Sequence, residues 1–512
     1  MLIRLLTAFA LALAPAVIHA ADFDLLIRRG EVYPDGRSEP LHVDVGVRGD
    51  KIAAMGNLAK KTANRVIDAS GLLVVPGFID VHGHGDEGGA FTSYLRQGVT
   101  TMVHGNCGGS RGARDMAAHL EALRGKQGLN YMTLVGHNSL RNAVGLSDAT
   151  PTAAQMKKMK ELLQQALAAG AFGLSSGLVY APGYNAQTDE LVELCRLVAA
   201  WDGVYATHMR HEDRRVLEAL DEALEIGRRS GVRVQISHIK CTGRRGWGLS
   251  HEILARVAEA RADGVRVMLD QYPYTAAATT LRILFPLWAQ RDWKAATTAR
   301  RGELLAALSA TLDENGGAEN IFVRSETHGQ IYLDALAKKL GKPPEVVLAD
   351  DLGLSGGRGI FHFMREDDVR TLMQGPEVML GSDGPTGSHP RGAGTFARFW
   401  GRYGRELGMF EPRECVNKTS TLAARQFRLI EQKRGALRVG FFADVAILDY
   451  DMINDTATYE NPSAAPRGIP YVIINGKLAL DKGRTTGARS GRVLRLTDSP
   501  LLKSPPDQEA GG

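Results

Sequence analysis

Residues 150–175 read TPTAAQMKKMKELLQQALAAGAFGLS and contain one complete helix-to-strand unit. Thr150 followed by proline is typical of a helix start, and Gly170 is typical of a helix end, because glycine tolerates the left-handed backbone that closes a helix. The apolar residues 171–175 then predict a strand. A similar order of helix, glycine and apolar strand recurs over residues 188–207, 214–237 and 250–269, and Ser250 is expected to cap the last of these helices. This repetition predicts a parallel sheet whose faces are covered by helices.

The number of such strands indicates how the sheet is arranged. Strands can be placed near residues 77, 100, 132, 172, 205, 235, 267 or 359, and 378. Eight parallel strands that alternate with helices favour an α/β fold of the (β/α)8 TIM-like barrel type over a doubly wound sheet. We therefore predict the barrel over residues 76–430. Residues 281–350 interrupt the alternation and are predicted to be a lid insertion over the barrel mouth.

The two ends of the chain differ from its middle. Residues 21–75 and 431–497 are β-rich, with short apolar runs between glycine and asparagine turns. Residues 1–20 contain one arginine, an apolar run and small residues at the end, which is typical of a secretory signal peptide. We expect export across the inner membrane into a bacterial periplasm, with no membrane anchor, because the run is too short to span a bilayer. Residues 498–512 are predicted to be a flexible tail.

The composition is that of a globular protein, since 44% of the 512 residues are hydrophobic and 23% are charged. These values exclude the disordered, collagen-like and polytopic membrane classes. The formal net charge is only +5 and no basic run stands out, so we expect no nucleic-acid partner. The four cysteines are not expected to form a disulfide framework, because Cys195 and Cys415 fall in helical patterns and are expected to be buried.

Side chains that can bind a metal follow several of the predicted strands. His82 and His84 are two residues apart, which places them on the same side of an extended chain. The carboxyl ends of the strands meet at one end of a barrel, and a mixed set of nitrogen, sulfur and oxygen donors suits Zn²⁺. The full set is His82, His84, Cys107, His208, His238 and Asp383. Each histidine taken alone could be a loop residue, and Cys107 could be a nucleophile paired with a histidine.

These strand ends resemble a known family. An H-x-H pair after the first strand, single histidines after the fifth and sixth, and S-D-G after the eighth are the pattern of the amidohydrolase superfamily. More closely, the chain resembles the N-acyl-D-amino-acid deacylase (D-aminoacylase) family over nearly its whole length after residue 20. The matching stretches include GVTTMVHGNCGG (98–109), GLSSGLVYAPG (173–183), ISHIKCTG (236–243), DQYPYTA (270–276) and GSDGPTGSHPR (381–391).

The resemblance implies a barrel with a small β-sandwich built from both chain ends. It also implies hydrolysis of a small-molecule N-acyl-D-amino acid to a carboxylate and a free D-amino acid, with a metal-bound water as the nucleophile. Cys107, His208 and His238 would hold a tight zinc, and His82, His84 and Asp383 a second, weaker metal position. Asp383 would be the general acid/base, and the substrate carboxylate would be bound by Lys240, Tyr272 and Arg391.

Two departures from the family pattern and three alternatives stay open at this point. Gly83 stands where relatives commonly have threonine, and Ala277-Ala278 replace a Gly-Ser pair, which leaves the preferred side chain of the substrate open. The same site could serve a dipeptidase that cleaves Xaa-D-amino-acid bonds, or a cyclic amidase similar to dihydroorotase or hydantoinase. A non-catalytic amidohydrolase-like binding protein is the remaining alternative, but such a protein should have lost metal ligands, and all six positions are filled here.

Overall fold

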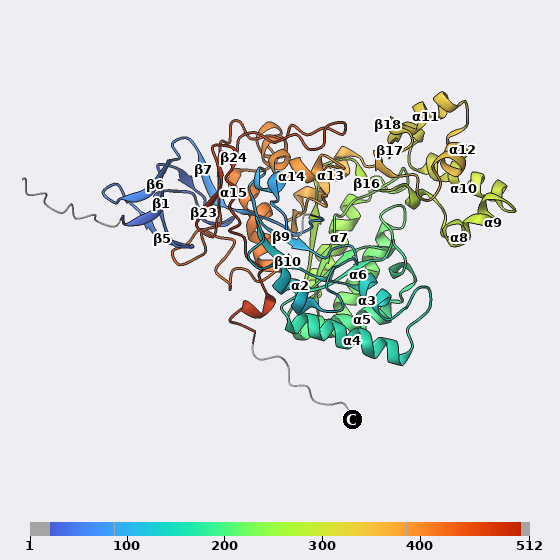
Figure 1. Cartoon of the computed structure of the whole chain (residues 1–512), viewed down its shortest axis with the longest axis horizontal. Coiled ribbons are helices and arrows are strands. Elements are labelled where there is room, and N and C mark those ends of the chain that lie inside the picture. Colours follow the sequence, from blue (N-terminus) through green and yellow to red (C-terminus); the bar gives the residue numbers. More distant parts are fainter. Residues whose placement is uncertain (1–20, 86–87, 386, 503–512) are drawn as a thin grey trace, which may run out of the picture.

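The computed structural model of the chain describes residues 21–85, 88–385 and 387–502 (Figure 1). The signal-peptide prediction for residues 1–20 lies outside these ranges, and so does most of the predicted tail. Within the three ranges, no helix is long and apolar enough to cross a membrane. The chain is an α/β protein in which parallel strands alternate with helices, as the sequence predicts.

Nine parallel strands in two hydrogen-bonded sheets form the centre of the fold. One sheet has the order β10-β9-β8 and contains Asn130–Thr133, Val99–His104 and Phe78–Asp80. The other has the order β11-β12-β13-β14-β15-β20 and contains Val135–Gly136, Gly173–Gly177, Val204–His208, Arg233–Ile236, Val267–Gln271 and Val378–Leu380. Of the two candidate positions for the seventh strand, residue 267 is therefore the one in the parallel sheet.

The two sheets are connected at both of their edges. Only Leu134 separates β10 from β11, and its N–H donates to the carbonyl of His104 at 2.9 Å. At the opposite edges, Gly83 after β8 and Gly384 after β20 form a parallel bridge. The Asp383 N–H also donates to the His82 carbonyl at 2.8 Å. The loops that carry the predicted metal ligands of the first and last strands are thereby held together.

The covering helices follow the predicted punctuation, with two corrections. Thr152, not Thr150, caps α4 (Ala153–Ala168), because its side chain and that of Gln155 bond reciprocally in a capping box. Ser250 was expected to cap α7 (Ser250–Ala262), but its hydroxyl donates to Asp368 at 2.6 Å instead. Gly231 ends α6 (Val216–Ser230) at a φ of 71°, as glycine at a helix end should. The helix α5 (Thr188–Ala200) completes this part of the cover.

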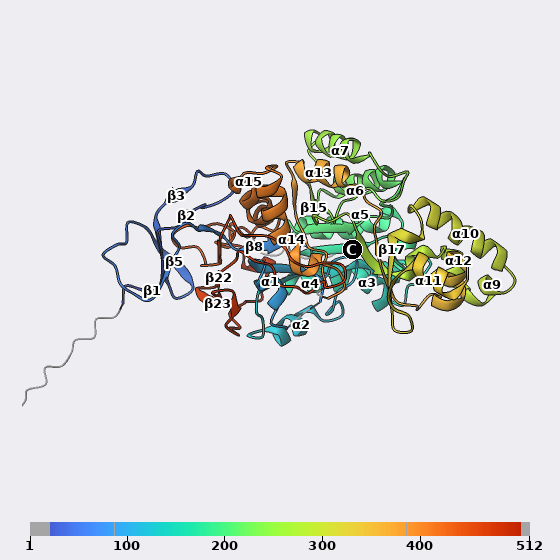
Figure 2. The same ribbon diagram turned by 90° about the horizontal axis from the view of Figure 1, so that it is seen from above.

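Both chain ends contribute to a pair of β-sheets at one end of the molecule (Figures 1 and 2). The four-stranded sheet β5-β4-β1-β6 contains Lys51–Gly56, Asp44–Arg48, Phe23–Arg28 and Ala63–Asp68. The seven-stranded sheet β24-β23-β22-β21-β7-β2-β3 contains Arg484–Thr485, Lys477–Asp481, Tyr471–Ile474, Val445–Leu448, Leu73–Pro76, Glu31–Val32 and Leu41–His42. One hydrophobic cluster includes Leu25, Val45, Val74, Val445 and Ile473, so the two sheets share a core. The tail was predicted to begin at residue 498, but Ser499 is buried and Leu502 packs against the core of the parallel strands.

The excursion between the seventh and eighth strands of the regular alternation is longer than the predicted 281–350. It contains an antiparallel sheet of order β16-β19-β17-β18, made of Ala277–Thr280, Arg358–Phe361, Ile321–Ser325 and Gly329–Tyr332. Helices such as α10 (Arg301–Glu314) and α11 (Leu333–Leu340) accompany this sheet at the end of the molecule opposite the terminal strands (Figures 1 and 2). A hydrophobic cluster of its own fills the excursion and includes Leu304, Leu308, Ile321, Leu333, Leu336, Leu348 and Phe361.

Candidate functional site

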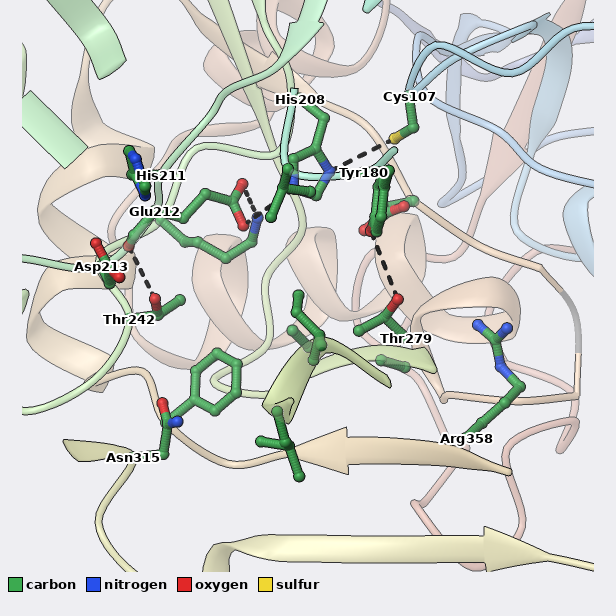
Figure 3. Close-up of a pocket in the computed structure, with 18 of the residues that line it drawn as sticks. Cys107, Tyr180, His208, His211, Glu212, Asp213, Thr242, Thr279, Asn315 and Arg358 are labelled. Carbon is green, nitrogen blue, oxygen red and sulfur yellow. Dashed lines mark hydrogen bonds and ion pairs between the residues drawn. The ribbon is translucent and has the colours of Figure 1, made fainter. Parts of the chain in front are cut away.

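Cys107 lies at the centre of a group of four histidines. Its Sγ is 3.2 Å from Nε2 of His82 and 3.7 Å from Nε2 of His84. The same sulfur is 3.7 Å from Nδ1 of His208, as Figure 3 shows, and 3.6 Å from Nε2 of His238. Ligands of a tetrahedral zinc are separated by about this distance, because each lies about 2.0–2.3 Å from the ion. Five of the six predicted metal ligands are therefore brought to one place.

The charge state of Cys107 fits a metal thiolate. Burial alone would raise the pKa of its thiol, but His82, His208 and His238 lower that pKa well below the ordinary value. The other three cysteines are buried free thiols, and burial raises the pKa of both Cys195 and Cys415. Since the thiolate is the form that binds zinc, Cys107 is the one suited to this chemistry.

The backbone at the site is strained. Cys107, His238 and Asp383 have φ angles of 53°, 36° and 47°, in the left-handed region that side chains other than glycine rarely adopt. Each such residue costs on the order of 1–3 kcal/mol and persists only where its surroundings hold it in place, which is common at functional sites. All three follow the ends of parallel strands, so the strain turns their side chains toward one point.

Two buried carboxylates hold the ligand loops from behind. Asp80, at the end of β8, accepts hydrogen bonds from the N–H of His82 at 3.1 Å and of Ser382 at 2.9 Å. Asp270, in β15, accepts from the N–H of His238 at 2.8 Å and lies 3.7 Å from Nδ1 of His82. These contacts link loops that are far apart in the sequence, and they limit the freedom of the ligands.

Asp383 faces both the cysteine–histidine cluster and a buried arginine. Its Oδ1 is 3.3 Å from Nε2 of His84, and its Oδ2 is 2.8 Å from Nη1 of Arg391. Burial would raise the pKa of the Asp383 carboxyl, but Arg391, His238 and the neighbouring histidines lower that pKa well below its ordinary range. The group is therefore a carboxylate, able to accept a hydrogen bond or a proton from a molecule in front of it.

A cavity of about 600 Å³ opens in front of this cluster. Its wall contains seven of the nine predicted site residues: His84, Cys107, His208, Lys240, Tyr272, Asp383 and Arg391. His82 and His238 lie directly behind them, in contact with Cys107. The excursion supplies another part of the wall, including Ala277, Ala278, Thr279, Ile283 and Arg358. Figure 3 shows Tyr180 reaching Thr279, a contact of 3.5 Å between hydroxyl oxygens that ties the excursion to the loop after β12.

Three of the predicted residues can receive an anion from the cavity. The Arg391 guanidinium lies 4.6 Å from the centre of the Tyr272 ring, and the Lys240 ammonium lies 5.8 Å from it. Among the described residues, neither the Tyr272 hydroxyl nor Nε of Arg391 has a hydrogen-bond partner, although both side chains are almost fully buried. Buried donors without a partner are costly, so a bound carboxylate would satisfy them.

Glu212 is the most closely connected of three residues of the site that were not predicted from the sequence. It lies on the loop after β13, and its carboxylate contacts Lys240 and Nδ1 of His238, the latter at 3.0 Å. Burial would raise the pKa of its carboxyl, but Lys240, His208 and His238 lower that pKa well below the ordinary value. Glu212 follows His208 by four residues, and this spacing was the signal by which the sequence could have placed it at the site. Tyr180 and Arg358 were also missed, because they lie in a loop and in the excursion.

The unusual glycine between His82 and His84 has a steric explanation. A Cβ at Gly83 would lie 2.4 Å from Sδ of Met102 in β9, closer than real side-chain contacts allow. Met102 fills the space that a threonine at residue 83 would need. The glycine therefore accompanies a large neighbouring side chain, and both histidines lie beside Cys107.

Comparison with known proteins identifies the family of the chain. The amidohydrolase family model matches residues 65–479. The chain is 36% identical to D-aminoacylase of Alcaligenes xylosoxydans xylosoxydans, over 93% of this chain and 98% of that protein. It is 37% identical to N-acyl-D-glutamate deacylase of the same organism, over 94% and 98% of the two chains. The crystal structure of N-acyl-D-glutamate deacylase from Bordetella bronchiseptica, complexed with zinc and a phosphonate mimic of the tetrahedral intermediate, matches with a TM-score of 0.79 at 35% identity, covering 92% of this chain and 99% of that one.

The match to the family model covers well over half of the chain, and the relatives align over almost their whole length. The chain therefore belongs to the amidohydrolase family, among the N-acyl-D-amino-acid deacylases (D-aminoacylases).

Proposed function

We propose that this protein is a zinc-dependent enzyme that hydrolyses N-acyl-D-amino acids to a carboxylate and a free D-amino acid. The observation that carries the proposal is the placement of Asp383, which lies between the cysteine–histidine cluster and buried donors that can receive a carboxylate. The relatives named above act on this class of substrate or bind a mimic of its tetrahedral intermediate with zinc.

Cys107, His208 and His238 would hold the tight zinc, and His82, His84 and Asp383 the weaker second position. One thiolate with imidazole nitrogens is a donor set that zinc favours. When bound, zinc supplies a Lewis acid that polarises the amide carbonyl and lowers the pKa of water. Asp383 takes a proton from the attacking water and returns it to the leaving amide nitrogen, which departs as an amine.

The substrate carboxylate would be bound by Lys240, Tyr272 and Arg391. Arg391 presents a planar set of donors that matches a carboxylate, and its contact with Asp383 links substrate binding to the proton-transfer group. The substrate is held at its carboxylate and at its scissile carbonyl, so its side chain can point in only one direction. The site should therefore distinguish the two enantiomers of the substrate.

We expect N-acetyl-D-amino acids to be cleaved at least about 100-fold faster than their L counterparts, because a misplacement of about 1 Å at the carbonyl can cost that factor. The measurement is kcat/KM for both enantiomers of N-acetylmethionine and N-acetylglutamate. Equal rates for the two hands would contradict the proposal. Faster turnover of hydantoins or dihydroorotate would indicate a cyclic amidase, and faster turnover of Xaa-D-amino-acid peptides a dipeptidase.

The change Tyr272→Phe is expected to raise KM about tenfold with a smaller change in kcat, because it removes one charge-assisted hydrogen bond to the substrate carboxylate. The ring and its packing against Arg391 are retained. The control is a substrate whose α-carboxylate is replaced by a carboxamide, for which the wild type and the variant should have similar KM values. An equal effect on both substrates would mean that the hydroxyl serves another purpose.

The finer architecture follows the same proposal. We infer that β10 and β11 are two halves of one interrupted strand. The nine strands β8 to β15 and β20 then correspond to the eight strands of a closed (β/α)8 barrel. The bridge between Gly83 and Gly384 supports closure. The shared core of the two terminal sheets supports a small β-sandwich built from both chain ends. The contact of Tyr180 with Thr279 supports a lid role for the excursion, which covers one side of the cavity.

We further propose that residues 1–20 direct export to the periplasm and are then removed. The support is the order of charged, apolar and small residues at this end of the sequence. Cell fractionation and the N-terminal sequence of the recovered protein test it, and a cytoplasmic protein that retains Met1 would contradict it.

A further inference from the structure

We infer that Glu212 is a positioning residue that fixes the metal-binding tautomer of His238, lies behind the ring of His208 and joins His238 to Lys240. This inference rests on the proposed zinc site and goes beyond it, because it assigns a role to a residue outside both the metal-ligand set and the substrate-binding set. His208 is the last residue of β13 and Glu212 lies on the loop that follows it, whereas His238 and Lys240 come from the loop after β14.

Each of the two histidines has one nitrogen toward Cys107 and the other toward Glu212. His208 presents Nδ1 to the sulfur at 3.7 Å, and its Nε2 lies 3.6 Å from Oε2 of Glu212. His238 presents Nε2 to the sulfur at 3.6 Å, and its Nδ1 lies 3.0 Å from Oε1 of Glu212. The two rings therefore use opposite nitrogens, and a single carboxylate stands behind both. Figure 3 shows Glu212 beside His208 at the edge of the cavity.

The chemistry at Nδ1 of His238 decides which neighbour can be its partner. Two groups lie within reach, Nζ of Lys240 at 2.8 Å and Oε1 of Glu212 at 3.0 Å. A lysine ammonium only donates, so it would require Nδ1 without a proton and would place the proton on Nε2, the nitrogen that must be free to bind a metal. A carboxylate only accepts, so it holds the proton on Nδ1 and leaves Nε2 available.

Glu212 is itself held in place by contacts that leave its carboxylate aimed at the histidines. Its backbone carbonyl accepts hydrogen bonds from the Thr242 N–H at 2.8 Å and from the Thr242 hydroxyl at 2.9 Å. Its side chain is 15% exposed and accepts a hydrogen bond from Lys240. The loops after β13 and β14 are thus held to each other, and the Lys240 side chain is oriented beside the cavity.

The test is the change Glu212→Gln, with zinc affinity measured by competition with a chelator and without substrate. We expect the zinc dissociation constant to rise about 10- to 100-fold, since loss of the group that orients a ligand has effects of this size. Glu212→Asp should recover part of the affinity, because it restores a carboxylate. Asp213→Asn is the matched control: that carboxylate lines the same cavity but accepts only the N–H of Arg215 among the described hydrogen bonds, and zinc affinity should be unchanged.

Two further measurements complete the test. The absorption spectrum of the cobalt-substituted protein should keep its tetrahedral character in Glu212→Gln, whereas a changed coordination number would mean that Glu212 is a direct ligand. Saturating zinc should restore most of the kcat of the variant if its role is to position the histidines. Wild-type zinc affinity in a folded Glu212→Gln protein would overturn the inference. Because affinity is measured without substrate, failure of the deacylase assignment would leave this result intact.

Discussion

Replacing Asp383 by asparagine should lower kcat by about 10³-fold while the tight zinc and the fold are retained. General acid/base catalysis contributes about 10²- to 10⁴-fold, and an amide cannot take up or return the proton. The substitution is nearly isosteric, and asparagine tolerates the φ of 47° found at this residue better than most side chains do. The loss should therefore be one of chemistry and not of structure.

The measurements for this variant are kcat, zinc content and the thermal unfolding midpoint. Zinc content should stay near one tightly bound ion per chain, since Cys107, His208 and His238 are sufficient to hold it in the proposed ligand set. Asp213→Asn, which changes another carboxylate in the wall of the same cavity, serves again as the control. Loss of the tight zinc from a folded Asp383→Asn protein would show that the ligand set is wrong.

Replacing Cys107 by alanine should remove the tight zinc and the activity together. The cysteine contributes the thiolate of the set, and its sulfur is the atom that all four histidines approach. A site left with imidazoles alone loses the ligand that zinc prefers. Zinc analysis after dialysis against a mild chelator, with activity measured on the same samples, checks the expectation.

A matched variant separates this effect from a general loss of packing. Cys195 is fully buried in α5, away from the cavity, and Cys195→Ala should keep both zinc and activity. A Cys107→Ala protein that is folded, loaded with zinc and inactive would favour the alternative in which Cys107 is the nucleophile. A metallated and active variant would remove the cysteine from the site altogether.

The clustering of the predicted metal ligands could be expected from the sequence because these residues stand at or after the ends of strands, whose direction and order are regular. Once the strands are parallel, the residues after them meet at one end, so His82 and Cys107 had to be neighbours although 25 residues separate them. The sequence contains no comparable signal for the preferred enantiomer of the substrate. The expectation of a D-amino acid came only from the resemblance to the family. The helix starts were misplaced by two residues at Thr152 because Thr150 and Thr152 are both good caps, and only the reciprocal bond with Gln155 decides between them.

Side chains that are oriented by contacts between loops could not be predicted from the order of the strands. Glu212 turns toward the histidines because Thr242, on another loop, holds its backbone. Arg358 lines the cavity because β19 folds back beside β16, a pairing that spans the whole excursion. The extent of the excursion was underestimated for the same reason, since its first and last strands pair with each other and not with the parallel sheets.

The separate hydrophobic core of the excursion allows selectivity and catalysis to diverge independently. Residues such as Leu308 and Phe361 stabilise this segment without help from the parallel strands that carry the metal ligands. Ala278 and Thr279 line the cavity, so substitutions of these side chains should change its shape while the predicted metal ligands, which belong to other segments, keep their positions. For protein engineering, the four-stranded excursion is therefore the segment to vary in order to change which amino acids are accepted. The residues proposed for hydrolysis could be left unchanged.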